Sequence, residues 1–175
     1  MKAIVIYNSQ TGFTKKYAEW ISQDAGCECV EFTKGSKMDL SAYDAVVYGG
    51  WCMAGNITKL AWFKKQMPSL YAAGKKLIVF AVGATPAESP EVEVAMNRLF
   101  TEEEKAMVKT FYCQGGLAYD KMNGPSKFAM GLMLKMLKKN KNPTEDDLKK
   151  IQMISTSYDI SDKKYVKGIV AELKG

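Results

Sequence analysis

Three hydroxyl side chains lie close together near the start of the chain. Ser9, Thr11 and Thr14 surround Gly12 in the stretch 9–14, which follows a short apolar run. Hydroxyl groups donate hydrogen bonds to oxyanions, and glycine lets the backbone approach a ligand closely. Apolar residues at helical spacing follow the stretch, so it lies where a strand passes into a helix. The free N–H groups and the dipole of the helix N-terminus favour a bound phosphate there.

Two familiar phosphate-loop patterns are missing from this stretch. No Gly-Lys-Ser/Thr follows four residues after a glycine, and Gly-x-Gly-x-x-Gly does not occur. The alternative to a phosphate site is an ordinary turn between strand and helix, in which Ser9 or Thr11 caps the helix.

The composition argues against several kinds of chemistry. The 175 residues include no histidine, which removes histidine-based triads, general bases and metal ligands. The four cysteines form no Cys-x-x-Cys pair, so we expect free thiols. The net charge of +6 comes from 24 lysines and one arginine, and the scarcity of arginine argues against a nucleic-acid partner.

The chain shows no feature that targets it to a membrane or out of the cell. No apolar run reaches the roughly 20 residues that a membrane-spanning helix needs. The N-terminal residues lack a signal-peptide cleavage pattern. We therefore expect a cytoplasmic protein.

Short apolar runs alternate with helical patterns along the whole chain. Continuous apolar runs are typical of parallel strands that are covered on both faces. The sequence therefore predicts one α/β domain over residues 1–175, with a doubly wound, five-stranded parallel sheet and helices on both faces. We expect the strands at residues 3–7, 27–32 (near an edge), 45–48, 77–82 and 110–114.

Between the strands, capping residues and proline indicate where helices begin and end. We expect residues 33–43 to form a loop and Pro68 to end or kink the helix that starts near Ile57. Thr101 and Thr144 are expected to cap two helices. The further expected helices lie at 90–100, at 126–141 and after Ser161-Asp162, and the segment 117–152 is an addition after the fifth strand.

Four of the five expected strands end in loops that suit a ligand. In parallel sheets, ligands bind beyond the carboxyl ends of the strands. Glycine in these loops lets a flat ring press against the backbone, and Trp51 offers a face for stacking. The four loops are 9–14, 49–55, 83–86 and 114–119.

The order and spacing of these loops over the first 116 or so residues resemble the flavodoxins. The resemblance implies FMN as cofactor and a redox protein that transfers electrons or hydride equivalents. It places the FMN phosphate among Ser9, Gln10, Thr11, Gly12, Phe13 and Thr14. It places the isoalloxazine ring among Gly50, Trp51, Cys52, Met53, Ala54, Gly55, Val82, Gly83, Ala84, Thr85, Gly116 and Tyr119.

Three of these residues have alternative interpretations. Trp51 either stacks on the flavin or packs on Trp62 or Met53. Cys52 is either redox-active beside the ring or a small, partly buried thiol. Tyr119 either touches the cofactor or a substrate, or packs with its hydroxyl capping a loop.

After the fifth strand the chain resembles one branch more closely. The residues 115–119 (GGLAY), followed by a basic, methionine-rich helix, resemble the menaquinone-dependent protoporphyrinogen oxidases, which carry an extra segment at this place. This resemblance implies an oxidoreductase with a quinone-type acceptor. The alternative is an electron carrier that serves redox partner proteins, although this chain is basic whereas carrier flavodoxins are usually acidic.

The extra segment carries most of the net charge. Residues 121–150 hold eight lysines against three acidic residues, so +5 of the +6 lies there. The Lys127–Lys141 helix has an unusually wide apolar arc. It is either buried against the sheet, or a surface for an anionic membrane, a quinone or a partner helix. A flavin-free binding or regulatory module at a membrane or partner surface is therefore the second functional hypothesis.

Overall fold

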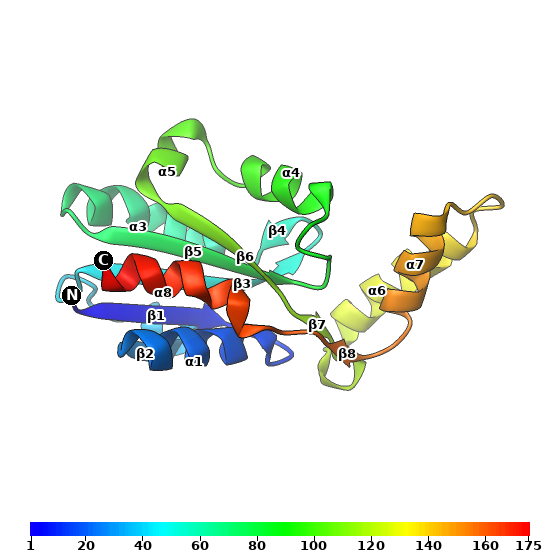
Figure 1. Cartoon of the computed structure of the whole chain (residues 1–175), viewed down its shortest axis with the longest axis horizontal. Coiled ribbons are helices and arrows are strands. Elements are labelled where there is room, and N and C mark those ends of the chain that lie inside the picture. The colour runs from blue at the N-terminus through cyan, green and yellow to red at the C-terminus, as the bar shows by residue number, and fades with distance from the viewer.

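A sheet of five parallel strands forms the centre of the protein (Figure 1). The computed structural model describes all residues from 1 to 175. The strand order is β2-β1-β3-β5-β6, so the predicted parallel sheet is confirmed and β2 lies at its edge as expected. The bounds are β1 (Ala3–Asn8), β2 (Glu28–Glu31), β3 (Ala45–Met53), β5 (Lys76–Gly83) and β6 (Lys109–Gln114).

Alternating side chains of the sheet build one core against α1 (Phe13–Ala25) and α8 (Lys167–Lys174). Val5 and Phe80 point to this face, where they pack in one cluster with Tyr17 of α1 and Ile169 of α8, all of them fully buried. The period of two along each strand sends the intervening residues to the opposite face.

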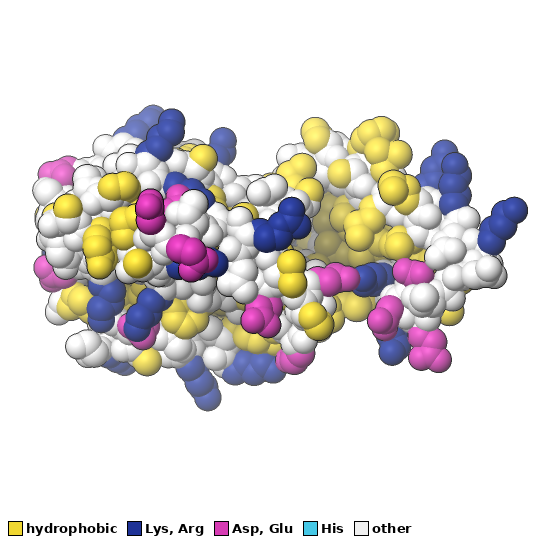
Figure 2. Space-filling model, turned by 90° about the horizontal axis from the view of Figure 1, so that it is seen from above, with side chains coloured by type: hydrophobic (Ala, Val, Ile, Leu, Met, Phe, Trp, Pro, Cys, Tyr) yellow, Lys and Arg dark blue, Asp and Glu magenta, His cyan; other side chains and the backbone are white.

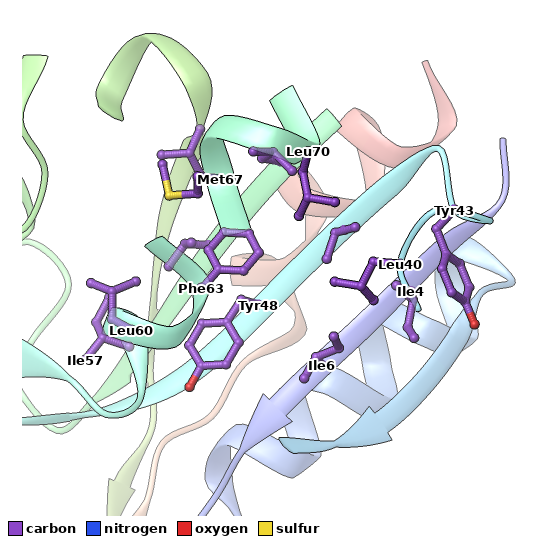
Figure 3. Close-up of a cluster of buried hydrophobic side chains, with 14 of the residues drawn as sticks. Ile4, Ile6, Leu40, Tyr43, Tyr48, Ile57, Leu60, Phe63, Met67 and Leu70 are labelled. Carbon is purple, nitrogen blue, oxygen red and sulfur yellow. The ribbon is translucent and has the colours of Figure 1, made fainter. Parts of the chain in front are cut away.

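The second core lies on that opposite face, under α3 (Leu60–Ala72). Ile4 and Ile6 of β1 and Tyr48 of β3 belong to one buried cluster with Phe63 and Met67 of α3, and Figure 3 shows Tyr48 beside Phe63. The helices α4 (Pro90–Arg98) and α5 (Glu102–Met107) complete the arrangement. Both faces of the sheet are therefore covered, as the continuous apolar runs predicted.

Strand β3 is longer than the sequence predicted. It continues through the glycine pair to Met53 and then turns back into β4 (Asn56–Ile57), with which it pairs antiparallel. A Cβ atom on Gly49 would lie 2.0 Å from Cζ of Phe80, so glycine here makes room for a buried ring within a strand. The turn uses Ala54 and Gly55, both with positive φ (48° and 77°).

Two further local expectations are wrong. The region expected to be a loop opens with a short helix, α2 (Phe32–Gly35), whose Gly35 packs closely on Ile6. Helix α3 continues past Pro68 to Ala72, so of the two expected effects of this proline, an end or a kink, the end is wrong. The helix also starts at Leu60, because Ile57 belongs to β4. Met67 and Leu70 remain buried on either side of the proline, and this burial offsets the missing backbone hydrogen bond.

The segment after β6 forms a helical hairpin that projects from the end of the sheet (Figure 1). We call α6 and α7 together the α6–α7 hairpin. Its base is a two-stranded ribbon in which β7 and β8 pair antiparallel. The elements are β7 (Gly116–Leu117), η1 (Tyr119–Lys121), α6 (Gly124–Lys138), α7 (Glu145–Ile154), β8 (Tyr158–Asp159) and η2 (Lys163–Val166).

The structure confirms two predicted caps, and the hairpin corrects one prediction of burial. Thr144 caps α7 in a capping box with Asp147, and Thr101 caps α5 in the same way. Helix α6 starts at Gly124 behind the N-cap Asn123, and none of its residues is buried. The interpretation of this helix as buried against the sheet is therefore wrong. No helix in the structure has both the length and the apolar character that crossing a membrane requires.

Candidate functional site

The hydroxyl-rich stretch forms the connection from β1 to α1. Gly12 is the N-cap residue of α1, in place of Ser9 or Thr11, with φ of 100°, a conformation that favours glycine. Its N–H donates to Oγ of Ser9 at 3.2 Å. No side chain caps α1, so the N–H groups of its first turn remain available to a ligand.

Thr14 carries an unusual hydroxyl group in the first turn of α1. The residue is 1% exposed, and its Oγ1 is the only buried side-chain nitrogen or oxygen without a hydrogen-bond partner. A buried polar group without a partner destabilises the fold by about 1–3 kcal/mol. An anion held by the loop would accept from this hydroxyl and remove that cost, so the residues present fit a phosphate.

A pocket opens beside this loop at the carboxyl end of the sheet. Its volume of about 380 Å³ lies within the range of small-molecule sites. We call it the sheet-end pocket. The residues expected at the cofactor that line it are Gln10, Thr11, Phe13, Thr14, Trp51, Cys52, Met53, Ala54, Val82, Gly83, Ala84 and Gly116.

Trp51 and Cys52 bring different properties to this pocket. Trp51 forms no aromatic pair, whereas Trp62 packs against Phe32, Tyr48 and Phe63, so the alternative in which Trp51 packs on Trp62 is wrong. Burial raises the pKa of the Cys52 thiol to about 12. At neutral pH this thiol is protonated, and a protonated thiol is a poor nucleophile.

Six of the expected residues do not line the pocket. Ser9 and Gly12 shape the loop, and Gly55 is in the β3–β4 turn. A Cβ atom on Gly50 would meet Ile57. The carbonyl group of Thr85 accepts from the hydroxyl of Tyr112 at 2.8 Å.

Tyr119, the last of the six, ties the base of the α6–α7 hairpin together. Its N–H donates to Oγ of Ser157 at 3.0 Å, and its hydroxyl donates to the carbonyl group of Ile154. These contacts are those of a packing tyrosine, although its hydroxyl caps the C-terminal end of α7 rather than a loop.

Helix α6 supplies a wall of the pocket that the sequence did not reveal. The further lining residues are Leu117, Met122, Ser126, Ala129, Met130 and Met133. Four of them, from Ser126 to Met133, recur at helical spacing and share one face of α6. This spacing was visible in the sequence, but the sequence did not show that the helix stands beside the sheet. Figure 2 shows the hollow between the main body and the hairpin, lined with apolar side chains.

A network of polar side chains fixes the strand ends behind the loop. The hydroxyl of Tyr17 donates to the carbonyl group of Gln114 and accepts the N–H of Asp162 at 3.0 Å. The Gln114 side-chain oxygen accepts from Ala87 N–H at 3.1 Å and from the Tyr165 hydroxyl at 3.0 Å. These bonds hold the ends of α1, β6 and the C-terminal segment in one rigid frame around the site.

Comparison with known proteins gives one family match. A family model described as a flavodoxin domain matches residues 4–144, most of the chain. No curated protein matches the sequence.

Several solved structures share the fold at low sequence identity. A flavodoxin from the domain Archaea is 18% identical over 100% of both chains, with a TM-score of 0.41. Trp repressor binding protein from Bacillus subtilis is 15% identical over 88% of this chain and 94% of its own, with a TM-score of 0.48. A flavoprotein in complex with FMN from Lactobacillus acidophilus is 17% identical over 65% of this chain and 91% of its own, with a TM-score of 0.43.

These structural likenesses are too weak to carry a functional argument, and none of the three is a protoporphyrinogen oxidase. The resemblance to that branch stays a prediction. The match to the family model is different, because it covers most of the chain and agrees with the strand order and the position of the loops. The chain therefore belongs to the flavodoxin family, whose members are FMN-binding redox proteins.

Proposed function

We propose that this protein is an FMN-dependent oxidoreductase with an apolar, quinone-type electron acceptor. The observation that carries the proposal is the buried, unpaired hydroxyl of Thr14, which lies in the first turn of α1 and lines the sheet-end pocket. One ligand with a phosphate and a flat ring would give the Thr14 hydroxyl a partner and fill the pocket.

Different parts of the chain would hold the two ends of FMN. Thr14 Oγ1 and the first N–H groups of α1 would donate to the phosphate. Trp51 and Gly83 would contact the ring from the sheet side, and Met130 of α6 from the opposite side. When bound, FMN supplies the electron-transfer chemistry, and the protein binds it, orients it and excludes water.

The lining of the pocket supports an apolar acceptor. Helix α6 contributes two methionines to the wall, Met130 and Met133, and Met122 lies just before the helix; their flexible side chains adapt to flat apolar molecules. Met53 and Met133 line the pocket and are each 45% exposed, so the pocket has an apolar rim. No histidine is present, and the protonated Cys52 thiol offers no base. The acceptor would therefore react at the cofactor without help from a side-chain acid or base.

The first test measures the cofactor. The purified protein is mixed with FMN, passed over a desalting column and examined by visible absorption spectroscopy. We expect a flavin spectrum that stays with the protein. Loss of all flavin would contradict the proposal and favour the flavin-free binding module instead.

The second test separates the two redox roles. FMN-loaded protein is assayed for turnover with protoporphyrinogen as donor and menadione as acceptor. Turnover with menadione is the expected result. No turnover, together with reduction of the bound flavin by a flavodoxin reductase, would assign the protein as an electron carrier between larger enzymes.

A further inference from the structure

We propose that the α6–α7 hairpin docks on the surface of an anionic lipid bilayer. The contact would use exposed apolar side chains of α6 and the lysines beside them. The proposal goes beyond the redox function and does not depend on whether flavin is bound.

One face of α6 exposes large apolar side chains in a row. Phe128, Leu132 and Met136 are 70%, 47% and 73% exposed and lie four residues apart, so they form one stripe along the helix. We call these three residues the apolar stripe. Figure 2 shows apolar side chains gathered on the projecting hairpin. Exposed apolar residues that gather in this way indicate an interaction surface.

The same segment carries a concentrated positive charge. We call the six lysines between residues 121 and 141 the lysine cluster, and no acidic residue lies between 121 and 144. All six are exposed and none forms an ion pair. The cluster consists of Lys121, Lys127, Lys135, Lys138, Lys139 and Lys141. Its charge is complementary to a negatively charged surface.

The chemistry of this surface favours lipid over a protein partner. Protein interfaces are depleted in lysine and enriched in arginine, and the hairpin contains no arginine. A helix that exposes phenylalanine and leucine next to lysines suits the bilayer interface, where apolar side chains enter the lipid and lysines meet the headgroups. Lysine stems extend along apolar surface while their charged ends reach anionic headgroups.

The apolar stripe continues into the sheet-end pocket. Ala129 and Met133 follow Phe128 and Leu132 in the sequence and line the pocket. Docking of the stripe would therefore bring the pocket mouth close to the lipid. If the proposed redox function holds, an acceptor dissolved in the bilayer would reach the cofactor by this route.

The first experiment measures binding of the full chain to lipid vesicles by flotation. Vesicles of phosphatidylcholine alone are compared with vesicles that contain phosphatidylglycerol. We expect binding only to the anionic vesicles, and weaker binding as the salt concentration rises.

Two lysine variants test the contribution of charge. The triple variant Lys135→Gln, Lys138→Gln, Lys139→Gln should bind anionic vesicles on the order of 100-fold more weakly. The matched control is Lys34→Gln, Lys37→Gln, Lys65→Gln, which removes the same charge from exposed, unpaired lysines of the main body. The control should bind as the unmodified chain does. Equal binding by the two variants would overturn the proposal.

A second pair of variants tests the apolar stripe. Phe128→Ser, Leu132→Ser, Met136→Ser should abolish vesicle binding. The control Tyr71→Ser, Val94→Ser, at two exposed apolar sites of the main body, should not. None of these residues lines the sheet-end pocket. A far-UV circular dichroism spectrum like that of the unmodified chain shows that each variant is folded.

Two outcomes would contradict docking on a bilayer and leave the proposed redox function unaffected. One is a flavin-loaded chain that binds neither kind of vesicle. The other is a dimer in sedimentation velocity that Phe128→Ser dissociates, because the stripe would then be an interface between copies of this chain.

Discussion

At the scale of single residues, the hydroxyl of Thr14 connects the stability of the protein with its function. A threonine in the first turn of a helix ordinarily finds a partner for its hydroxyl, and this one is buried without one. Such a group destabilises the free protein and gains a partner when an anion binds. The same hydroxyl therefore lowers the stability of the free protein and strengthens the binding of an anion.

Thr14→Val tests both effects of the hydroxyl, because valine keeps the shape of the side chain and lacks the hydroxyl. We expect FMN affinity to fall by about 10- to 100-fold, the value of a hydrogen bond to a charged group. Unfolding of the FMN-free variant by urea should show unchanged or higher stability. Fluorescence titration measures the affinity.

Riboflavin is the control ligand for this variant, since it lacks the phosphate. Its affinity should be the same for Thr14→Val and for the unmodified chain. An equal loss for FMN and riboflavin would mean that Thr14 acts on the ring or on the fold.

Residue types and spacing predicted most of the sheet-side lining of the pocket, because loops that follow parallel strands meet at one edge. They did not predict the methionines from Met122 to Met133, whose position depends on where α6 stands in space. Nor could they show that Thr85 and Tyr119 turn to partners outside the pocket. Such contacts depend on residues distant in the sequence.

At the scale of elements, the ribbon of β7 and β8 joins the hairpin to the main body. A Cβ atom on Gly116 would lie 2.0 Å from the carbonyl oxygen of Tyr158, so the two strands approach as closely as only glycine allows. Asp159 of β8 also pairs with Lys16 of α1 at 2.8 Å. This ion pair links the ribbon to α1, the helix that follows the hydroxyl-rich stretch.

The Asp159–Lys16 pair predicts a dependence of stability on pH. Partial burial opposes ionisation of Asp159, but hydrogen bonds from Lys16 and Ser161 prevail and lower its pKa from 3.8 to about 2. A lowered pKa in the folded state stabilises the protein above about pH 4, and this contribution is lost as the pH falls toward 2. Because the pair is half-exposed, the contribution is about 1 kcal/mol or less.

Asp159→Asn removes this contribution. Urea unfolding should show the variant less stable than the unmodified chain at pH 6, with the difference vanishing near pH 2. The control is Asp120→Asn, which changes an exposed carboxylate that forms no ion pair. A constant difference between Asp159→Asn and the unmodified chain across this pH range would contradict the assignment.

The sequence predicted the elements well where local signals decide, as in the capping boxes at Thr101 and Thr144. It failed where distant neighbours decide. The glycine pair at the end of a strand indicated a loop, yet Gly49 lies within β3. Glycine is needed there because the ring of Phe80 of β5 occupies the space that a side chain would fill. The pattern of α6 was equally ambiguous, since a wide apolar arc does not say what covers it.

At the scale of the whole molecule, the α6–α7 hairpin is an addition to a sheet that is already complete. Neither of the two buried clusters includes a residue between 118 and 157. Leu117 and Tyr158 face each other in the ribbon, so their backbones are already close enough to be joined by a two-residue turn. The hairpin therefore contributes to the pocket and to the surface, and little to the core.

Replacing residues 118–157 by Asn-Gly tests this division. We expect the shortened chain to unfold cooperatively, since both cores remain, as circular dichroism on heating would show.

The shortened chain should still bind FMN through the β1–α1 loop, but more weakly, because the α6 wall is gone. Quenching of flavin fluorescence by iodide should increase for the same reason, and binding to anionic vesicles should disappear. A shortened chain with no cooperative transition would show instead that residues 1–175 form one inseparable folding unit.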